Sequence, residues 1–277
     1  MLADKRILIT GVATPDSIAW ATARAARDLG ARVVLTAFPR DMDAARALAA
    51  ELDPGIRVHP LDLCDPAQLA AVTGAISAEL GGLDAALHAV AFAPAGALGG
   101  DLTTTDPADV ELAFRTSAWT LAALAGALRD LAPAAGASLV GLDFDANEGA
   151  WPVYNWMGVC KAALRATTRY LARDLGASGI RVNLVAAGPL ETRAARGIPD
   201  FDRLLDAWAT TAPLAWNTTD ARPVADATCF LMSDLARAVT GEILHVDGGY
   251  HAMAAPLHPD RSRLGEPALV ASAGALG

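Results

Sequence analysis

Short apolar runs alternate with amphipathic segments along most of the chain. Seven runs have the length of a strand, and none alternates strictly between apolar and polar residues, which is typical of parallel strands covered on both faces. The predicted strands are residues 6–10, 32–38, 56–61, 83–90, 138–142, 180–186 and 242–246. Apolar residues at helical spacing lie between them, for example in residues 18–29, 42–52, 68–80 and 108–131. The pattern predicts an α/β fold, a Rossmann-type doubly wound parallel sheet of about seven strands.

The predicted elements fit a single domain. A chain of 277 residues has the length of one large α/β domain, and residues 1–255 carry the alternating pattern. Residues 256–277 are rich in proline, glycine, alanine and charge without a periodic apolar face, so we expect a flexible C-terminal tail there. In doubly wound sheets ligands bind beyond the carboxyl ends of the strands, so the residues just after each run are the candidate site residues.

Composition narrows the classes of function. The net charge of −9, with no basic stripe, argues against nucleic acid and anionic membrane surfaces as partners. Charged residues interrupt each long apolar stretch before it reaches membrane-spanning length. The three cysteines are widely spaced and the histidines form no pair at ligand spacing, so no metal site is expected. Reduced thiols and a start without a signal-like apolar core predict a cytoplasmic protein.

The turn after the first predicted strand is a candidate dinucleotide site. Gly11 at the strand end allows a tight turn, and Ser17 and Ile18 open the next helix, whose free N–H groups attract a pyrophosphate. The G-x-G-x-x-G spacing is absent, so the alternative is an ordinary turn in which Ser17 caps the helix. Further candidates follow the third, fourth and sixth strands: Asp62, Leu63, Val90, Ala91, Leu190 and Thr192. For Asp62 the alternative is a role in starting the next turn.

Tyr154 and Lys161 belong to the most specific motif. Six residues separate them in the run Tyr154-Asn155-Trp156-Met157-Gly158-Val159-Cys160-Lys161. Together with residues 143–145, 186–189 and 214–217, this run resembles the NADH-dependent enoyl-acyl-carrier-protein reductases of the short-chain dehydrogenase/reductase superfamily, especially those of very-long-chain, mycolic-type fatty acid synthesis. The resemblance extends from about residue 4 to residue 253.

The chemistry of the motif agrees with this resemblance. Carbonyl-reducing members of the superfamily have a tyrosine four residues before the lysine and a serine about thirteen residues before that tyrosine; here these positions hold Met157 and Phe144. Neither side chain donates a proton, so carbonyl reduction loses its acid. Reduction of an enoyl thioester needs a donor aimed at the thioester oxygen, and Tyr154 is the candidate. The resemblance implies that Lys161 bonds the nicotinamide ribose and that Phe144 packs near the nicotinamide and the enoyl group.

By the same resemblance, the strand-end candidates divide along a dinucleotide. The implied contacts are with the phosphates for Ser17, Ile18 and Thr192, with the adenine for Asp62 and Leu63, with the middle of the cofactor for Val90 and Ala91, and with the nicotinamide carboxamide for Leu190. Phe38 would lie near the adenine or, alternatively, act as a hydrophobic plug. NADH is favoured as the cofactor. NADPH stays open because no acidic residue follows the second strand and Arg40 lies nearby.

The acyl site is expected to involve Tyr154, Met157, Leu204 and Trp208. For Leu204 and Trp208 the alternative is packing of a helix against the core. Residues 192–208 form a shorter and more basic segment than in the long-chain enzymes, which makes a shorter or non-fatty acyl group an alternative substrate. Ala91 and Glu191 also depart from the residues common in the relatives, which puts cofactor affinity in question.

The sequence thus predicts an NADH-dependent enoyl-acyl-carrier-protein reductase of fatty acid biosynthesis, which reduces the 2,3 double bond of an enoyl thioester. The expected carrier is acyl carrier protein or coenzyme A. The alternatives are a reductase of another activated alkene in a tailoring pathway, and a nucleotide-binding homologue without catalysis. A homotetramer is expected because members of the superfamily commonly form one.

Overall fold

A single parallel sheet organises the chain. The structure is a computed structural model that describes residues 1–144 and 149–257. Within these residues seven strands pair in the order β3-β2-β1-β4-β5-β6-β7, and every neighbouring pair is parallel. The strands are β1 (Arg6–Ile9), β2 (Arg32–Ala37), β3 (Val58–Pro60), β4 (Ala85–His88), β5 (Ala137–Asp143), β6 (Ile180–Ala187) and β7 (Ile243–Val246). The predicted doubly wound fold is confirmed, and its strand order reverses between β1 and β4, where ligands bind in such sheets.

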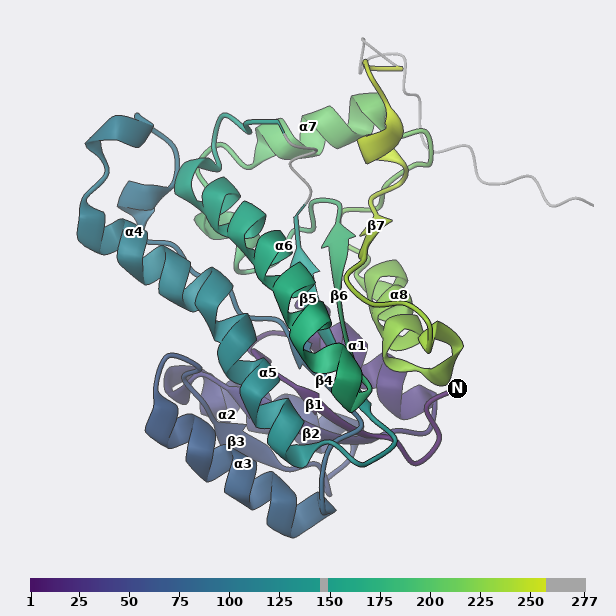
Figure 1. The fold of residues 1–277 in the computed structure, drawn as a ribbon. Helices are drawn as coiled ribbons and strands as arrows, with labels where there is room; N and C mark the ends of the chain where they lie inside the picture. The colour runs from purple at the N-terminus through teal and green to yellow at the C-terminus, as the bar shows by residue number, and fades with distance from the viewer. Residues whose placement is uncertain (145–148, 258–277) are drawn as a thin grey trace, which may run out of the picture.

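Helices cover both faces of the sheet (Figure 1). They are α1 (Ile18–Asp28), α2 (Met42–Leu52), α3 (Pro66–Leu80), α4 (Pro107–Phe114), α5 (Thr120–Leu131), α6 (Asn155–Leu175), α7 (Asp202–Thr211) and α8 (Arg222–Met232). Successive side chains of β1 point to opposite faces: Ile7 and Ile9 join the core under α1, α2 and α8, whereas Leu8 joins the core under α3, α5 and α6. Helix α7 lies beyond the carboxyl ends of β5 and β6 (Figure 1).

Some element boundaries differ from the sequence prediction. β3 is shorter than expected, and β4 ends at His88, so Val90 follows the strand instead of closing it. The helix expected over residues 108–131 is divided into α4 and α5 by a π turn at Arg115–Trp119. Hydrophobic spacing does not reveal such a turn because it adds only one residue to the helix. The Ser117 hydroxyl in this turn accepts from the Phe92 N–H and donates to the Phe92 carbonyl, which fixes the segment after β4.

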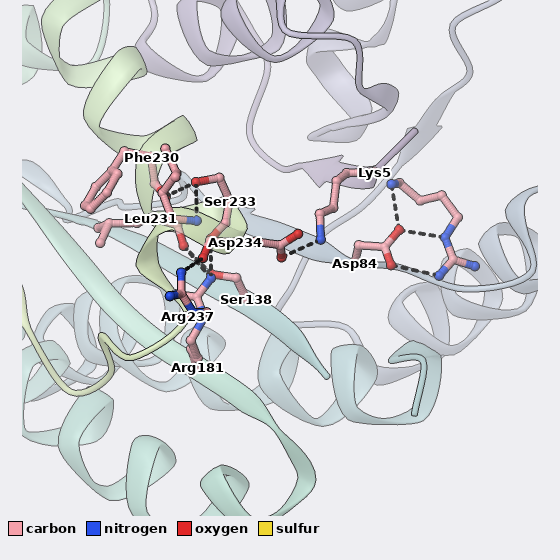
Figure 2. Close-up of polar contacts among 11 residues, drawn as sticks. Lys5, Asp84, Ser138, Arg181, Phe230, Leu231, Ser233, Asp234 and Arg237 are labelled. Carbon is pink, nitrogen blue, oxygen red and sulfur yellow. Dashed lines mark hydrogen bonds and ion pairs between the residues drawn. The ribbon is translucent and has the colours of Figure 1, made fainter. Parts of the chain in front are cut away.

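Polar contacts join α8 to the sheet at the amino ends of the strands (Figure 2). The half-buried guanidinium of Arg181 on β6 donates to the carbonyls of Leu231 and Ser233, at distances of 2.7 and 3.2 Å. Ser138 on β5 donates to the Leu231 carbonyl as well, at 2.9 Å. Burial lowers the pKa of Arg181. These contacts hold the end of the molecule opposite to the carboxyl ends of the strands.

The predicted division into a domain of residues 1–255 and a tail of residues 256–277 stays a prediction, because residues 258–277 lie outside the described part. No helix among the described residues has the length and apolar character needed to cross a membrane. The three cysteines are free thiols, and Cys160 and Cys229 are buried.

Candidate active site

The turn after β1 approaches the turn after β4 very closely. Gly11 has a φ of +75°, and a Cβ at this position would lie 2.3 Å from the Ala89 carbonyl oxygen. The Thr10 hydroxyl donates to the Leu87 carbonyl and accepts from the Ala89 N–H, which joins the same two turns. Only glycine fits such a backbone contact without a shift. The site therefore begins with a narrow backbone cradle at the switch point of the sheet.

Helix α1 begins at Ile18, a few residues after this cradle in the sequence. The Ser17 hydroxyl accepts from the Trp20 N–H at 3.1 Å and donates to the Thr14 carbonyl at 2.8 Å, so Ser17 caps the helix. The first N–H groups of a helix, here starting at Ile18, have no partner within the helix and attract negative charge. The cradle and this helix end fit a pyrophosphate, although the phosphate contacts of Ser17 and Ile18 stay predictions.

Phe38 marks the adenine end of the predicted site. Its side chain is 42% exposed, so it is not a hydrophobic plug, and the Arg40 guanidinium lies 4.9 Å from the ring centre. Asp62 accepts from the Cys64 N–H at 2.8 Å, which is the turn-starting role considered as its alternative. The Leu63 side chain is buried in the core, which leaves its backbone as the part that faces a ligand. Their adenine contacts stay predictions.

The segment after β6 reaches across to the segments after β1 and β2. Arg196 forms an ion pair of 3.0 Å with Asp16, and Arg193 one of 2.9 Å with Asp41. Thr192 accepts from the Ala195 N–H through its hydroxyl at 3.2 Å.

Leu190, at the start of this segment, is buried with 6% exposed. Val90 and Ala91 follow β4, where Val90 is half-buried and Ala91 exposed. The Glu191 carboxylate accepts from the Thr218 hydroxyl. The segment after β6, which is predicted to contact the dinucleotide, is thus joined by ion pairs to the segments after β1 and β2. The cofactor contacts of Leu190, Thr192, Val90 and Ala91 stay predictions.

Tyr154 and Lys161 are both buried where α6 meets β5. Tyr154 precedes the first residue of α6, and Lys161 follows two helical turns later. The Lys161 ammonium donates to the Leu142 carbonyl at 2.8 Å, and the Tyr154 ring centre lies 5.1 Å from that of Phe144. Within residues 1–144 and 149–257 the Tyr154 hydroxyl has no hydrogen-bond partner. Burial raises the pKa of Tyr154 and lowers that of Lys161.

Arg165 completes an ion pair that sequence reasoning missed. Its Nε donates to Asp143 Oδ2 at 2.6 Å, and its Nη2 donates to the Phe144 carbonyl at 3.1 Å. Asp143 Oδ1 is buried and has no hydrogen-bond partner in the part of the chain that the structure describes. Burial raises the pKa of Asp143, and the charges of Lys161 and Arg165 act against this rise. Arg165 lies one helical turn after Lys161, and this spacing is the signal that indicates a shared face.

His88 at the end of β4 is a second residue that sequence reasoning missed. Its Nε2 lies 2.9 Å from the Thr120 hydroxyl, which donates its own proton to the Thr116 carbonyl. Nε2 must therefore carry the hydrogen and donate. Burial, with the nearby charge of Lys161, lowers the pKa of His88 to about 3. The imidazole is thus neutral at physiological pH.

The residues expected to line the acyl site are all buried. Met157 is 6% exposed, and Leu204 and Trp208 are each 1% exposed. The Trp208 ring centre lies 5.4 Å from that of Phe144, so α7 packs against the site itself. Trp151 and Tyr250, which the sequence did not single out, also contact Trp208. Trp208 therefore packs its helix against the protein core and also lies beside the candidate site, so the two alternatives do not exclude each other.

Comparison with known proteins gives the family. A family model described as enoyl-(acyl carrier protein) reductase matches residues 11–251, which include every candidate site residue. The chain belongs to this family.

Relatives from several bacteria match nearly the whole chain. The enoyl-[acyl-carrier-protein] reductase [NADH] of Mycolicibacterium smegmatis is 36% identical over 263 residues, which cover 90% of this chain and 97% of the relative. Relatives with the same enzyme name from Bacillus subtilis and Neisseria meningitidis are 38% and 39% identical, over 91% and 90% of this chain and 98% and 95% of their own lengths. The resemblance to the NADH-dependent reductases of this family is confirmed.

Proposed function

We propose that the chain reduces the 2,3 double bond of an enoyl thioester with NADH. The single observation that carries the proposal is the buried Tyr154 phenol, whose hydroxyl has no hydrogen-bond partner among the described residues and whose ring packs against Phe144 and the Met157 and Cys160 side chains of α6. The family and the names of the relatives support NADH as the cofactor and acyl carrier protein as the carrier. Coenzyme A is the alternative carrier.

Tyr154 acts as the proton donor to the thioester oxygen. NADH, which Lys161 and the strand-end residues would hold, would supply a hydride to the β-carbon of the substrate, and water would later protonate the α-carbon to complete the reduction. Negative charge then builds up on the thioester oxygen, and a donor already in position stabilises it without reorganisation. Because burial raises the pKa of Tyr154, the phenol keeps its proton at neutral pH. One helical turn later, the position that holds the catalytic tyrosine in carbonyl-reducing members of the superfamily is Met157, whose side chain cannot donate a proton.

Lys161 positions the cofactor and adds a positive charge. Its ammonium is anchored at the Leu142 carbonyl, which uses one of three donors and leaves two for ribose hydroxyls. The ammonium also favours the negative charge that develops on the substrate. Burial lowers the pKa of Lys161, and the charge of the nearby Asp143 acts against this lowering, which favours the charged form of the lysine.

The remaining contacts follow the sequence prediction. Ser17, Ile18 and Thr192 hold the phosphates beside the tight turn at Gly11, and Leu190 binds the nicotinamide carboxamide. The other strand-end candidates hold the adenine and the middle of NADH. The protein acts in the cytoplasm as a homotetramer, in fatty acid biosynthesis.

Replacement of Tyr154 by phenylalanine tests the mechanism. Tyr154→Phe removes the donor and keeps the ring, so we expect kcat/KM for crotonyl-CoA to fall by about 100-fold or more. The measurement is oxidation of NADH followed by absorbance. Tyr170→Phe, on the exposed face of the same helix, is the matched control and should leave the rate unchanged. An unchanged rate in Tyr154→Phe contradicts the proposed donor, and no NADH oxidation with any enoyl thioester contradicts the proposed function.

A further inference from the structure

Five aromatic side chains form a continuous cluster beside the proposed donor. The ring cluster consists of Phe144, Trp151, Tyr154, Trp208 and Tyr250. The Phe144 ring centre lies 5.1 Å from that of Tyr154 and 5.4 Å from that of Trp208. Trp208 lies 5.4 Å from Trp151 and stacks on Tyr250 at 3.9 Å, with an angle of 12° between the planes. Ring contacts therefore lead from the phenol of Tyr154 to Tyr250.

Trp208 is held firmly at the centre of the ring cluster. It is 1% exposed, and its indole N–H donates to the Asp247 carbonyl at 3.0 Å. The same indole nitrogen lies against Gly188, where a Cβ would come within 2.8 Å of it. A turn of this indole away from Phe144 would break the hydrogen bond and leave a buried donor unpaired. The ring is therefore a fixed wall.

The other members of the ring cluster come from separate segments. Phe144 follows β5, Trp151 precedes α6, and Tyr250 lies in a 3-10 turn after β7. The buried Asp247 carboxylate holds this turn, because it accepts from the N–H groups of Gly249 and His251 at 2.8 and 2.9 Å. Since the rings approach from different directions, they fill the space beyond Phe144 with protein.

We infer that the ring cluster ends the acyl site close to the reacting carbons, so that this chain reduces short enoyl thioesters in preference to long ones. The inference rests on the proposed function, because it takes Tyr154 as the donor to the thioester oxygen. An acyl chain that starts beside Tyr154 and Phe144 soon meets Trp208. Further methylenes gain no buried surface there unless they displace a fixed indole.

The wild-type enzyme provides the first test. Its kcat/KM is measured with crotonyl-CoA, octenoyl-CoA and dodecenoyl-CoA, each below its micelle-forming concentration and with NADH saturating. We expect kcat/KM to be at least about tenfold lower with dodecenoyl-CoA than with crotonyl-CoA. A smaller difference, or a preference for the longer chain, overturns the inference while the proposed function stands. Absence of NADH oxidation with all three thioesters overturns both.

Variants of Trp151 and Tyr250, two half-buried members of the ring cluster, test which residues limit the length of the acyl chain. Trp151→Ala and Tyr250→Ala each remove a ring that packs against Trp208. Each should therefore raise the ratio of kcat/KM for dodecenoyl-CoA to kcat/KM for crotonyl-CoA by at least about fivefold. This ratio does not depend on the fraction of folded enzyme, so partial unfolding does not obscure it. Tyr170→Ala, an exposed aromatic on α6, is the matched control and should leave the ratio unchanged. A smaller rise of this ratio in both Trp151→Ala and Tyr250→Ala overturns the inference that the ring cluster limits the length of the acyl chain.

Discussion

Individual buried groups set the charge of the site. Lys161 and Arg165 bring two positive charges to the carboxyl end of β5, and the Asp143 carboxylate opposes them. His88 lies near the same lysine but stays neutral, since burial penalises its charged form. The site therefore keeps its positive charge on the side of α6, where negative charge develops on the substrate in the proposed reaction.

The neutral state of His88 predicts how stability depends on pH. The folded protein takes up the proton only near pH 3, whereas an unfolded chain takes it up near about pH 6.5. Acid therefore favours the unfolded chain, and His88 should lower the free energy of unfolding by about 1.4 kcal/mol per pH unit between these values. His88→Gln keeps a donor for Thr120 and does not titrate. Urea unfolding from pH 7 to pH 4 should show a shallower loss in this variant, and equal slopes would refute the assignment.

At the scale of elements, the turn between β1 and α1 determines where the amino end of α1 lies relative to the sheet. Its backbone lies against the turn after β4, and the contact leaves no room for a side chain at Gly11. The same turn places the amino end of α1 at the switch point. The position of the proposed pyrophosphate site thus depends on one residue without a Cβ.

Gly11→Ala tests this dependence. The new Cβ would collide with the Ala89 carbonyl in a backbone conformation that alanine rarely adopts, so we expect a loss of at least about 1 kcal/mol of stability. Affinity for NADH, measured by calorimetry, should fall as well. Gly74→Ala on the exposed face of α3 is the control, because no atom lies within 4 Å of its Cβ position. It should stabilise the protein by about 0.5–1 kcal/mol. An unaltered NADH affinity in Gly11→Ala would argue against the cradle.

The sequence predicted those elements and caps that depend on the spacing of residues close together in the chain. The apolar runs located all seven strands, and the cap at Ser17 and the face of α6 that carries Lys161 follow from residues close in sequence. The π turn at Arg115–Trp119 escaped prediction because it adds only one residue to the helix, and its contact between Ser117 and Phe92 joins residues that are distant in sequence. The end of β4 was placed too late for a similar reason, since apolar residues continue past the last pairing.

At the scale of the whole molecule, the two ends of the sheet have different roles. The carboxyl ends of the strands carry the candidate active site, and the amino ends carry the polar contacts that join α8 to β5 and β6 (Figure 2). The polar contacts at the amino ends therefore contribute to stability without touching the candidate active site. A change at the amino end should alter stability without altering the chemistry.

Arg181→Ala tests this separation. The variant removes the charged donor of the Leu231, Ser233 and Val239 carbonyls, each of which keeps one neutral donor, so we expect a loss of about 2–3 kcal/mol in urea unfolding. The kcat/KM of the folded enzyme should stay within about twofold of wild type. Arg173→Ala, an exposed residue on α6, is the control and should change stability by less than about 0.5 kcal/mol. A fall in kcat/KM at unchanged stability would contradict the separation.

The sequence by itself determined the doubly wound sheet, the family, and the motif that carries Tyr154 and Lys161, because periodicity and spacing are local properties of a chain. Only the tertiary structure decided which side chains meet at the strand ends. His88 finds Thr120, and Trp208 stacks on Tyr250, across segments that no local pattern connects. These contacts arise when separate helices and strands are packed at near-crystalline density, so their geometry depends on the whole fold.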